Sequence, residues 1–275
     1  MAQNDSFVHL HVHSEYSMLD GAARVKPLIQ AAAERKMPAI AVTDHGNTFG
    51  AFDFWKSARD QGVKPIIGIE AYVTPGTHRS DRTRVRWGDG AGDDVSGAGA
   101  YTHMTLLSQT TEGMHNLFRL SRRASIEGYY FKPRMDRELL QTYSKGLIAT
   151  TGCPSGEIQT RIRLGQLKEA REAAAEFQDL FGKENFFCEL MDHGLDIERR
   201  VKKDLIDIAR DLKIPLVATN DLHYVHESDA DAHSALLCVQ SGSRLDDPNR
   251  FQFSGSGYYL KSAAEMRHIF RELPE

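Results

Sequence analysis

Short apolar runs, each followed by a stretch with helical spacing, recur along this chain, and this alternation limits the fold more than any other feature. The runs and the helical stretches that follow them are 7–12 and 25–35, 39–43 and 51–60, 65–72 and a polar insertion, 102–107 and 114–125, 146–150 and 158–181, 186–191 and 198–212, and 215–219 and 229–239. Alternating strands and helices are typical of a parallel sheet covered by helices. Seven such units in 275 residues favour a closed sheet over an open one, so we predict an α/β fold, a distorted (βα)7 barrel.

The organisation of the chain follows from where this pattern stops. Residues 74–100 are rich in Gly, Arg and Asp and lack apolar periodicity, which predicts a flexible insertion. No repeat or linker divides the rest, so we expect a single domain over 1–275. A helix predicted over 262–271 runs almost to the final residue, which indicates a fragment of a longer protein.

Charge and composition exclude several classes of protein. A net charge of −4 and a pI near 6.3 are not those of a protein that grips nucleic acid by overall charge, so any contact with DNA must be local. No apolar run approaches the roughly 20 residues of a membrane span, and the first residues lack the features of a signal peptide. We therefore predict a cytoplasmic protein without membrane contact. Three widely spaced cysteines make a disulfide framework improbable.

Histidines alternate in the segment HLHVHSEY near the start of the chain. Side chains of a strand alternate between its faces, so His9, His11 and His13 share one face, with neighbours about 7 Å apart. This spacing lets His11 and His13 bind one metal or two adjacent metals; the alternative is a pair of hydrogen-bonded histidines. His9 lies one step further back, and we expect it to support the ligands.

A second pair, Asp221 and His223, has the same spacing in NDLHY at the end of another predicted strand. The carboxyl ends of the parallel strands in a βα barrel meet at one face, so the two pairs are expected to converge. Carboxylates mixed with imidazoles suit zinc, manganese or iron. A cysteine thiolate among the ligands would favour zinc.

Four more acidic or imidazole residues, in three segments, have two readings each. In VTDHGN, one of Asp44 and His45 is expected to bind metal while the other braces it through a hydrogen bond. Glu70 closes an apolar strand, either because it meets a cation or because the strand end is solvated. Asp20 precedes Gly21 and is either a ligand or a turn residue.

His103 and the cysteines complete the candidates. His103 stands near the start of its strand, which is the wrong end unless that strand runs in the opposite direction or is short. Cys153, just after IATTG, is either a ligand or the start of a helix. Cys188 and Cys238 lie in apolar segments, where a role in the core is expected.

Taken together, HVH, LDG, TDHGN, an acidic strand end, a lone His, TTGCPSG and NDLHY resemble the PHP family, named for polymerase and histidinol phosphatase. The resemblance covers essentially the whole chain. It implies a PHP-type barrel of seven βα units and a cluster of up to three divalent metals, with zinc favoured and manganese as the second choice. The ligand positions that it implies are His11, His13, Asp20, His45, Glu70, His103, Cys153, Asp221 and His223.

The longer segments FVHLHVHSEYSMLDGA and GYYFKPRMD resemble the branch of this family found in the alpha subunits of bacterial DNA polymerase III. This resemblance implies a proofreading 3′-5′ exonuclease, because all nine ligand positions hold residues that can bind metal. Asp20, His45 and Asp221 are the expected catalytic residues. The implied partners are the 3′ end of a DNA primer strand, further polymerase domains in the same chain, and the sliding clamp and other replisome subunits through the full-length protein.

The hypothesis for the reaction is attack on the terminal phosphate by a hydroxide that the metals activate, with a further metal stabilising the leaving 3′ oxygen. Tyr130, Lys132 and Arg134, with Tyr129, are the expected substrate contacts because they combine stacking surfaces with positive charge; the alternative is a surface loop that packs on its own domain. In the insertion, the arginines either touch DNA or are simply solvated. These are Arg79, Arg82, Arg84 and Arg86.

Two other functions use the same residues. A phosphatase of the histidinol-phosphate kind would apply the metals to a phosphomonoester. A metal-binding scaffold of a polymerase would use them for stability alone.

Overall fold

The structure is a computed structural model that describes residues 6–88 and 95–273. The chain forms two compact units: unit 1 holds the residues up to Ile67 and those from Ala218 onward, and unit 2 holds Gly68–Val217. The organisation of 1–275 as one domain stays a prediction. Within the described ranges, no helix combines the length and the apolar character needed to cross a membrane.

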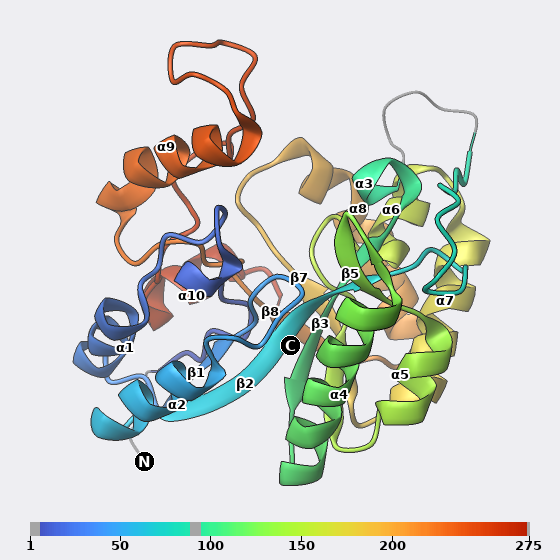
Figure 1. Cartoon of the computed structure of the whole chain (residues 1–275), viewed down its shortest axis with the longest axis horizontal. Coiled ribbons are helices and arrows are strands. Elements are labelled where there is room, and N and C mark those ends of the chain that lie inside the picture. Colours follow the sequence, from blue (N-terminus) through green and yellow to red (C-terminus); the bar gives the residue numbers. More distant parts are fainter. Residues whose placement is uncertain (1–5, 89–94, 274–275) are drawn as a thin grey trace. The chain divides into compact units, whose positions relative to one another are not determined.

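Unit 1 is built on two amphipathic helices and a short parallel strand pair. Its elements are η1 (Glu15–Ser17), α1 (Val25–Glu34), β1 (Ala39–Val42), α2 (Ala51–Asp60), the first part of β2 (Lys64–Val73), η2 (Glu227–Asp229), α9 (Ala230–Ser241) and α10 (Ala263–Ile269) (Figure 1). In α1, the buried residues Leu28, Ile29 and Ala32 have helical spacing, and α1 packs against α2. On its own buried face, α2 carries Phe54 and Ala58. The core of unit 1 therefore forms where the apolar faces of the two helices meet.

Instead of the strand predicted over 7–12, the structure has an irregular segment with one isolated parallel bridge, between Val12 and Leu222. Main-chain hydrogen bonds nevertheless run to both sides of this segment. Ala41 N donates to His9 O at 2.9 Å, and His13 N donates to Leu222 O at 2.7 Å. These bonds do not continue into a ladder beyond the single bridge, so the strand predicted over 7–12 is wrong.

Unit 2 is a mixed sheet with helices that follow most of its strands. Its elements are the rest of β2, α3 (Ser96–Gly99), β3 (Thr102–Ser108), α4 (Thr111–Glu127), β4 (Tyr129–Tyr130), β5 (Lys132–Met135), α5 (Arg137–Tyr143), β6 (Leu147–Thr150), α6 (Glu157–Arg163), α7 (Leu167–Phe181), β7 (Phe186–Leu190), α8 (Asp196–Leu212) and β8 (Leu216–Ala218), whose last residue belongs to unit 1. The strand order is β4-β5-β2-β3-β6-β7-β8, and α4 packs on β3 and β5. The predicted α/β fold is confirmed by this alternation.

The alternation of elements had predicted a parallel sheet, but the observed sheet is mixed. β3 runs antiparallel to both of its neighbours, β2 and β6. Apolar runs give the position of a strand but not its direction, so the sequence could not settle this. Because β3 runs the other way, the start of β3, where His103 stands, lies beside the end of β2.

The hairpin of β4 and β5 was not predicted, because strands of two and four residues are too short to show alternation. β5 extends the sheet by pairing in parallel with the end of β2, with Tyr72 opposite Arg134. The segment GYYFKPRM is therefore part of the sheet and its edge.

The first part of the segment 74–100 is tied to unit 2. Arg79 is buried, and its guanidinium lies 2.7 Å from Glu127 Oε2 and 3.0 Å from Asp136 Oδ2. Residues 89–94 lie outside the described residues, and the flexibility of the insertion stays a prediction.

Candidate metal centre

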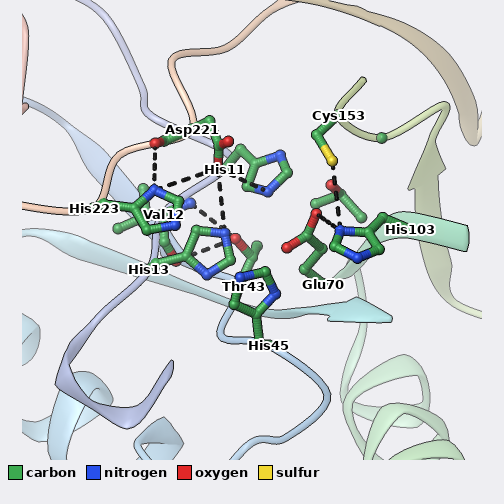
Figure 2. Close-up of polar contacts among 12 residues, drawn as sticks. His11, Val12, His13, Thr43, His45, Glu70, His103, Cys153, Asp221 and His223 are labelled. Carbon is green, nitrogen blue, oxygen red and sulfur yellow. Dashed lines mark hydrogen bonds and ion pairs between the residues drawn. The ribbon is translucent and has the colours of Figure 1, made fainter. Parts of the chain in front are cut away.

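Six of the predicted ligands gather in unit 1, and we call them the histidine cluster. Its members are His11, His13, Asp20, His45, Asp221 and His223. Figure 2 shows the rings of His11, His13 and His223 turned toward the carboxylate of Asp221. The cluster is assembled almost wholly from loops that follow or flank short strands.

Asp221 is the centre of one half of the cluster. Its Oδ1 lies 3.4 Å from His11 Nε2, 3.3 Å from His13 Nε2 and 3.7 Å from His223 Nδ1. The His13 ring is also packed between two other imidazoles, with centroid distances of 4.1 Å to His45 and 4.3 Å to His223. Three imidazoles therefore surround this carboxylate, and a fourth, His45, packs on the ring of His13.

Asp20 is the centre of the other half. Its Oδ2 lies 3.0 Å from His45 Nε2, and its Oδ1 lies 3.6 Å from His223 Nε2. The turn that carries Asp20 depends on Gly21, because a Cβ at this position would lie 2.0 Å from the carbonyl oxygen of Ser14. The reading of Asp20 as a turn residue and its reading as a ligand are thus compatible.

The spacing of these atoms fits a shared cation. Ring nitrogens of His13, His45 and His223 lie within 4.8 Å of one another. Two ligands on one tetrahedral zinc ion stand about 3.3 Å apart, because each lies about 2.0 Å from the metal. Buried atoms of the described residues that form no hydrogen bond include three in this cluster: Asp20 Oδ1, Asp221 Oδ1 and His223 Nε2. Buried polar atoms are normally satisfied, so the donor set fits divalent metal.

Electrostatics prepare both carboxylates for this role. Burial opposes ionisation of Asp20, but the hydrogen bond with His45 and the charge of His223 outweigh it and hold the pKa of the carboxyl below its usual range. Burial likewise opposes ionisation of Asp221, yet His223, His11 and His13 together lower its pKa. Both residues are carboxylates at neutral pH and therefore supply negative charge for a cation.

The backbone at Asp221 is strained. Its φ is +44°, in the left-handed region that residues other than glycine seldom adopt. In this conformation the Asp221 carbonyl oxygen accepts a hydrogen bond at 2.8 Å from Nδ1 of His223, two residues further along the chain. A carbonyl oxygen can only accept, so Nδ1 donates in this bond, and Nε2 of His223 is the ring nitrogen that faces Asp20.

Asp44 supports the cluster and does not bind in it. Its carboxylate accepts hydrogen bonds from Ser14 N at 2.6 Å, Ser14 Oγ at 2.9 Å and Ser17 Oγ at 3.0 Å. Ser17 Oγ in turn lies 2.9 Å from His13 Nδ1 and accepts from His45 N at 3.1 Å. In VTDHGN, the brace is thus Asp44 and the candidate ligand is His45.

Two other buried histidines lie at the edge of the cluster. His9 Nε2 lies 2.9 Å from Lys261 O, and burial lowers the pKa of His9 to about 4, so this ring is neutral and donates to the carbonyl. His233 Nε2 donates to Asp20 O at 2.8 Å and so holds the turn that carries Asp20. The sequence analysis missed His233 and Ser17, because neither stands in a spacing that indicates a ligand.

Three predicted ligands gather in unit 2, and we call Glu70, His103 and Cys153 the thiol cluster. His103 Nδ1 lies 2.8 Å from Glu70 Oε1 and 3.5 Å from Cys153 Sγ, as Figure 2 shows. Glu70 is on β2 and His103 on β3, and Cys153 follows β6. The antiparallel direction of β3 brings His103 to this place. Carboxylate, imidazole and thiol together are a ligand set that zinc accepts.

The predicted substrate contacts divide into one buried residue and two partly exposed ones. Arg134 is 1% exposed, and its guanidinium donates to four carbonyls, those of Gly128, Ala100, Arg79 and Asp81. Four of the five N–H donors of this buried guanidinium are thus used to hold main-chain segments together. Lys132 and Tyr130 are only partly buried, with Lys132 Nζ 5.5 Å from the Tyr72 ring centroid and the Arg134 guanidinium 5.0 Å from the Tyr130 ring centroid.

This chain was compared with known proteins in sequence and in structure. The alpha subunit of DNA polymerase III from Saccharopolyspora erythraea is 59% identical over 280 residues, which is 98% of this chain and 23% of that protein. The subunit of the same name from Mycobacterium tuberculosis is 58% identical over 268 residues, covering 96% of this chain and again 23% of the relative. An amidohydrolase structure from Chromobacterium violaceum has a TM-score of 0.41 and 16% identity over 79% of this chain and 87% of that one. That score is too low to assign a fold.

The PHP domain family matches residues 9–193. The matched range contains His11, His13, Asp20 and His45 of the histidine cluster and all three residues of the thiol cluster. The resemblance noted in the sequence is thereby confirmed, and the chain belongs to the PHP domain family.

Proposed function

We propose that this PHP domain is a metal-dependent phosphodiesterase that removes the terminal nucleotide from the 3′ end of DNA. The observation that carries the proposal is the histidine cluster, in which two ionised carboxylates and four imidazoles face one another at the spacing of metal ligands. Bound divalent metals would supply a nucleophilic water at neutral pH and positive charge for the leaving 3′ oxygen.

The residues of the chain have separate tasks in this reaction. Asp221 and Asp20 hold negative charge at fixed places and orient the imidazoles around them. His45 and His223 complete the donor set, each with its Nε2 facing one oxygen of the Asp20 carboxylate. Asp44 keeps His13 and His45 in position through Ser17. Asp20, His45 and Asp221 are the residues we assign to catalysis.

Zinc is the metal we propose, with manganese as the second choice. Imidazole-rich donor sets suit zinc, and the thiol of Cys153 favours it further over harder cations. We propose that both clusters take up divalent metal, three ions in all.

The relatives support a proposal for the parent protein. The chain spans 23% of the length of the two DNA polymerase III alpha subunits compared with it. We propose a proofreading role on primer 3′ ends in the cytoplasm, alongside further polymerase domains of the same chain, with the sliding clamp and other replisome subunits as partners of the full-length protein.

The test follows a 5′-labelled single strand and a primer with a mismatched 3′ end, with and without chelator, for this chain and for Asp221→Asn. Stepwise shortening from the 3′ end is expected, and both chelator and substitution should reduce its rate by at least about 100-fold, because the chelator removes the metals and the substitution removes a carboxylate that would hold them. Asp246→Asn is the matched control, since Asp246 is exposed and pairs only locally with Arg244 at 3.0 Å.

Each other outcome contradicts the proposal in its own way. Hydrolysis of small phosphomonoesters without shortening of DNA would mean a phosphatase. No hydrolysis of either substrate by protein shown to contain its metals, together with a loss of stability on chelation, would mean a structural scaffold. An undiminished rate in Asp221→Asn would refute the assignment of the histidine cluster.

A further inference from the structure

The β4–β5 hairpin presents aromatic rings to solvent, and the backbone at its tip is strained. Phe131, at the tip, has a φ of +61° and a side chain that is 59% exposed. Tyr129, on the same hairpin, is 62% exposed. A left-handed backbone costs a residue with a side chain about 1 to 2 kcal/mol, and such strain gathers at functional sites.

Two buried arginines hold the start of the insertion against this hairpin. Arg134 Nη2 donates to Arg79 O at 2.8 Å and to Asp81 O at 2.7 Å, while its Nε donates to Gly128 O at 3.0 Å. Arg79 is fixed in turn by Glu127 and other carboxylates of unit 2. The two arginines therefore build a surface from two distant segments of the sequence.

The surface that results is cationic and aromatic. Arg82 and Arg84 are exposed, and the Arg84 guanidinium lies 5.2 Å from the centroid of the Phe131 ring. Lys132 adds a third positive charge on the hairpin. The carboxylates packed nearby are engaged: Glu127 with Arg79 and Arg123, and Asp81 with Thr83 N at 2.8 Å. We call Arg82, Arg84, Tyr129, Phe131 and Lys132 the hairpin surface.

From this arrangement we infer that the hairpin surface binds unpaired nucleic acid. Arginines and lysines neutralise phosphates, and exposed aromatic rings stack on bases that no partner strand covers. A duplex would satisfy the charges but not the rings. On this surface Arg82 and Arg84 contact phosphates, and Phe131 and Tyr129 stack on bases. Arg134 and Arg79 serve as internal supports.

Binding is measured by fluorescence anisotropy with a labelled oligothymidine, in chelator, so that the result does not depend on hydrolysis by the metal centre. Phe131→Ala should weaken binding roughly tenfold, and Phe131→Trp should restore it, because the stacking is lost and regained. Arg82→Ala with Arg84→Ala should lower the slope of log affinity against log salt by about 0.7 for each lost phosphate contact.

The controls are matched residues of unit 2. Phe118→Ala removes another exposed ring, 37% exposed on α4, and Arg171→Ala removes another exposed arginine, paired with Asp211. Neither should change affinity or salt slope. Equal losses in these controls, an unchanged affinity in Phe131→Ala, or tighter binding of duplex than of the single strand would overturn the inference. Because hydrolysis is blocked, a negative result here leaves the proposed exonuclease untouched, and an inactive metal centre leaves this binding untouched.

Discussion

Loops carry the six residues of the histidine cluster, whereas two of the three residues of the thiol cluster stand on paired strands. His13 and His45 are positioned by side chains, through the hydrogen bonds of Ser17 and Asp44. Glu70 and His103 are positioned by the main-chain ladder of β2 and β3, which pairs Tyr72 with His103. One group of candidate ligands therefore depends on neighbouring side chains and the other on backbone register.

This difference predicts where each cluster is vulnerable. A ladder survives the loss of any one side chain, because its hydrogen bonds belong to the backbone. A network of buried side-chain hydrogen bonds fails when one member is removed, since the others are left without partners. The histidine cluster should accordingly respond to metal and to mutation more than the thiol cluster does.

The largest expected effect comes from metal. Zinc at about a thousand times its Kd should raise the free energy of unfolding by about 4 kcal/mol, because it binds only the folded chain. Urea unfolding with zinc and with chelator measures this difference. Hydrogen exchange should slow most at 11–20, 43–47 and 221–223. Equal slowing along α4 would show that the two clusters do not differ in this respect.

Asp44→Ala should have the next largest effect. It leaves the buried donors of Ser14 and Ser17 without their acceptor, which should lower the free energy of unfolding by about 3 kcal/mol. Metal affinity should fall by roughly 10- to 100-fold, because the ligands lose their support. Urea unfolding and zinc titration give the two values. Asp60→Ala, which removes only an exposed pair with Lys56, should leave both nearly unchanged.

Glu70→Gln tests the other side of the comparison. The substitution keeps the size of the side chain and all main-chain bonds of β2, so the free energy of unfolding should fall by only about 1 kcal/mol. Zinc affinity should nevertheless decrease, because a carboxylate is lost beside His103. A destabilisation as large as that of Asp44→Ala would refute the contrast between ladder and side-chain support.

The smallest effect is expected at Cys188, which serves as an internal control for Cys153. Burial raises the pKa of the Cys188 thiol to about 12, so this thiol should resist alkylation in the folded chain at pH 8 and react as the pH approaches its pKa or the chain unfolds. Zinc should slow the labelling of Cys153 and leave that of Cys188 unchanged. Mass spectrometry of the alkylated peptides distinguishes the two. Zinc protection at both thiols would mean that the protection reflects overall stabilisation.

Much of this architecture was accessible from the sequence because it rests on local patterns. The predicted helix at 51–60 coincides with α2, and the side chains of the two pairs in HVH and DLH lie within 3.7 Å of a common carboxylate oxygen or of each other. Direction and tertiary contact were not accessible. Nothing in the run 102–107 shows that β3 is antiparallel, and nothing in the helix 230–241 shows that His233 reaches Asp20, 213 residues away in the sequence.

The arginines illustrate the same limit. Arg79, Arg82 and Arg84 were expected either to touch DNA or to be solvated, and Arg134 either to contact substrate or to belong to a surface loop that packs on its own domain. The structure buries Arg79 and Arg134 and exposes Arg82 and Arg84. Burial of a guanidinium depends on whether enough carbonyls and carboxylates surround it, which is a property of the assembled fold.

The left-handed backbone at Asp221 has a consequence for how this site can change over generations. Aspartate and asparagine tolerate a φ of +44° better than branched or bulky residues, so few substitutions at this position preserve the chain's course. Asparagine is also one nucleotide away from aspartate in the genetic code. A lineage that no longer needed the chemistry could abandon it here in a single mutational step and keep the fold, so position 221 is the one to compare first between descendants that retain the activity and those that have lost it.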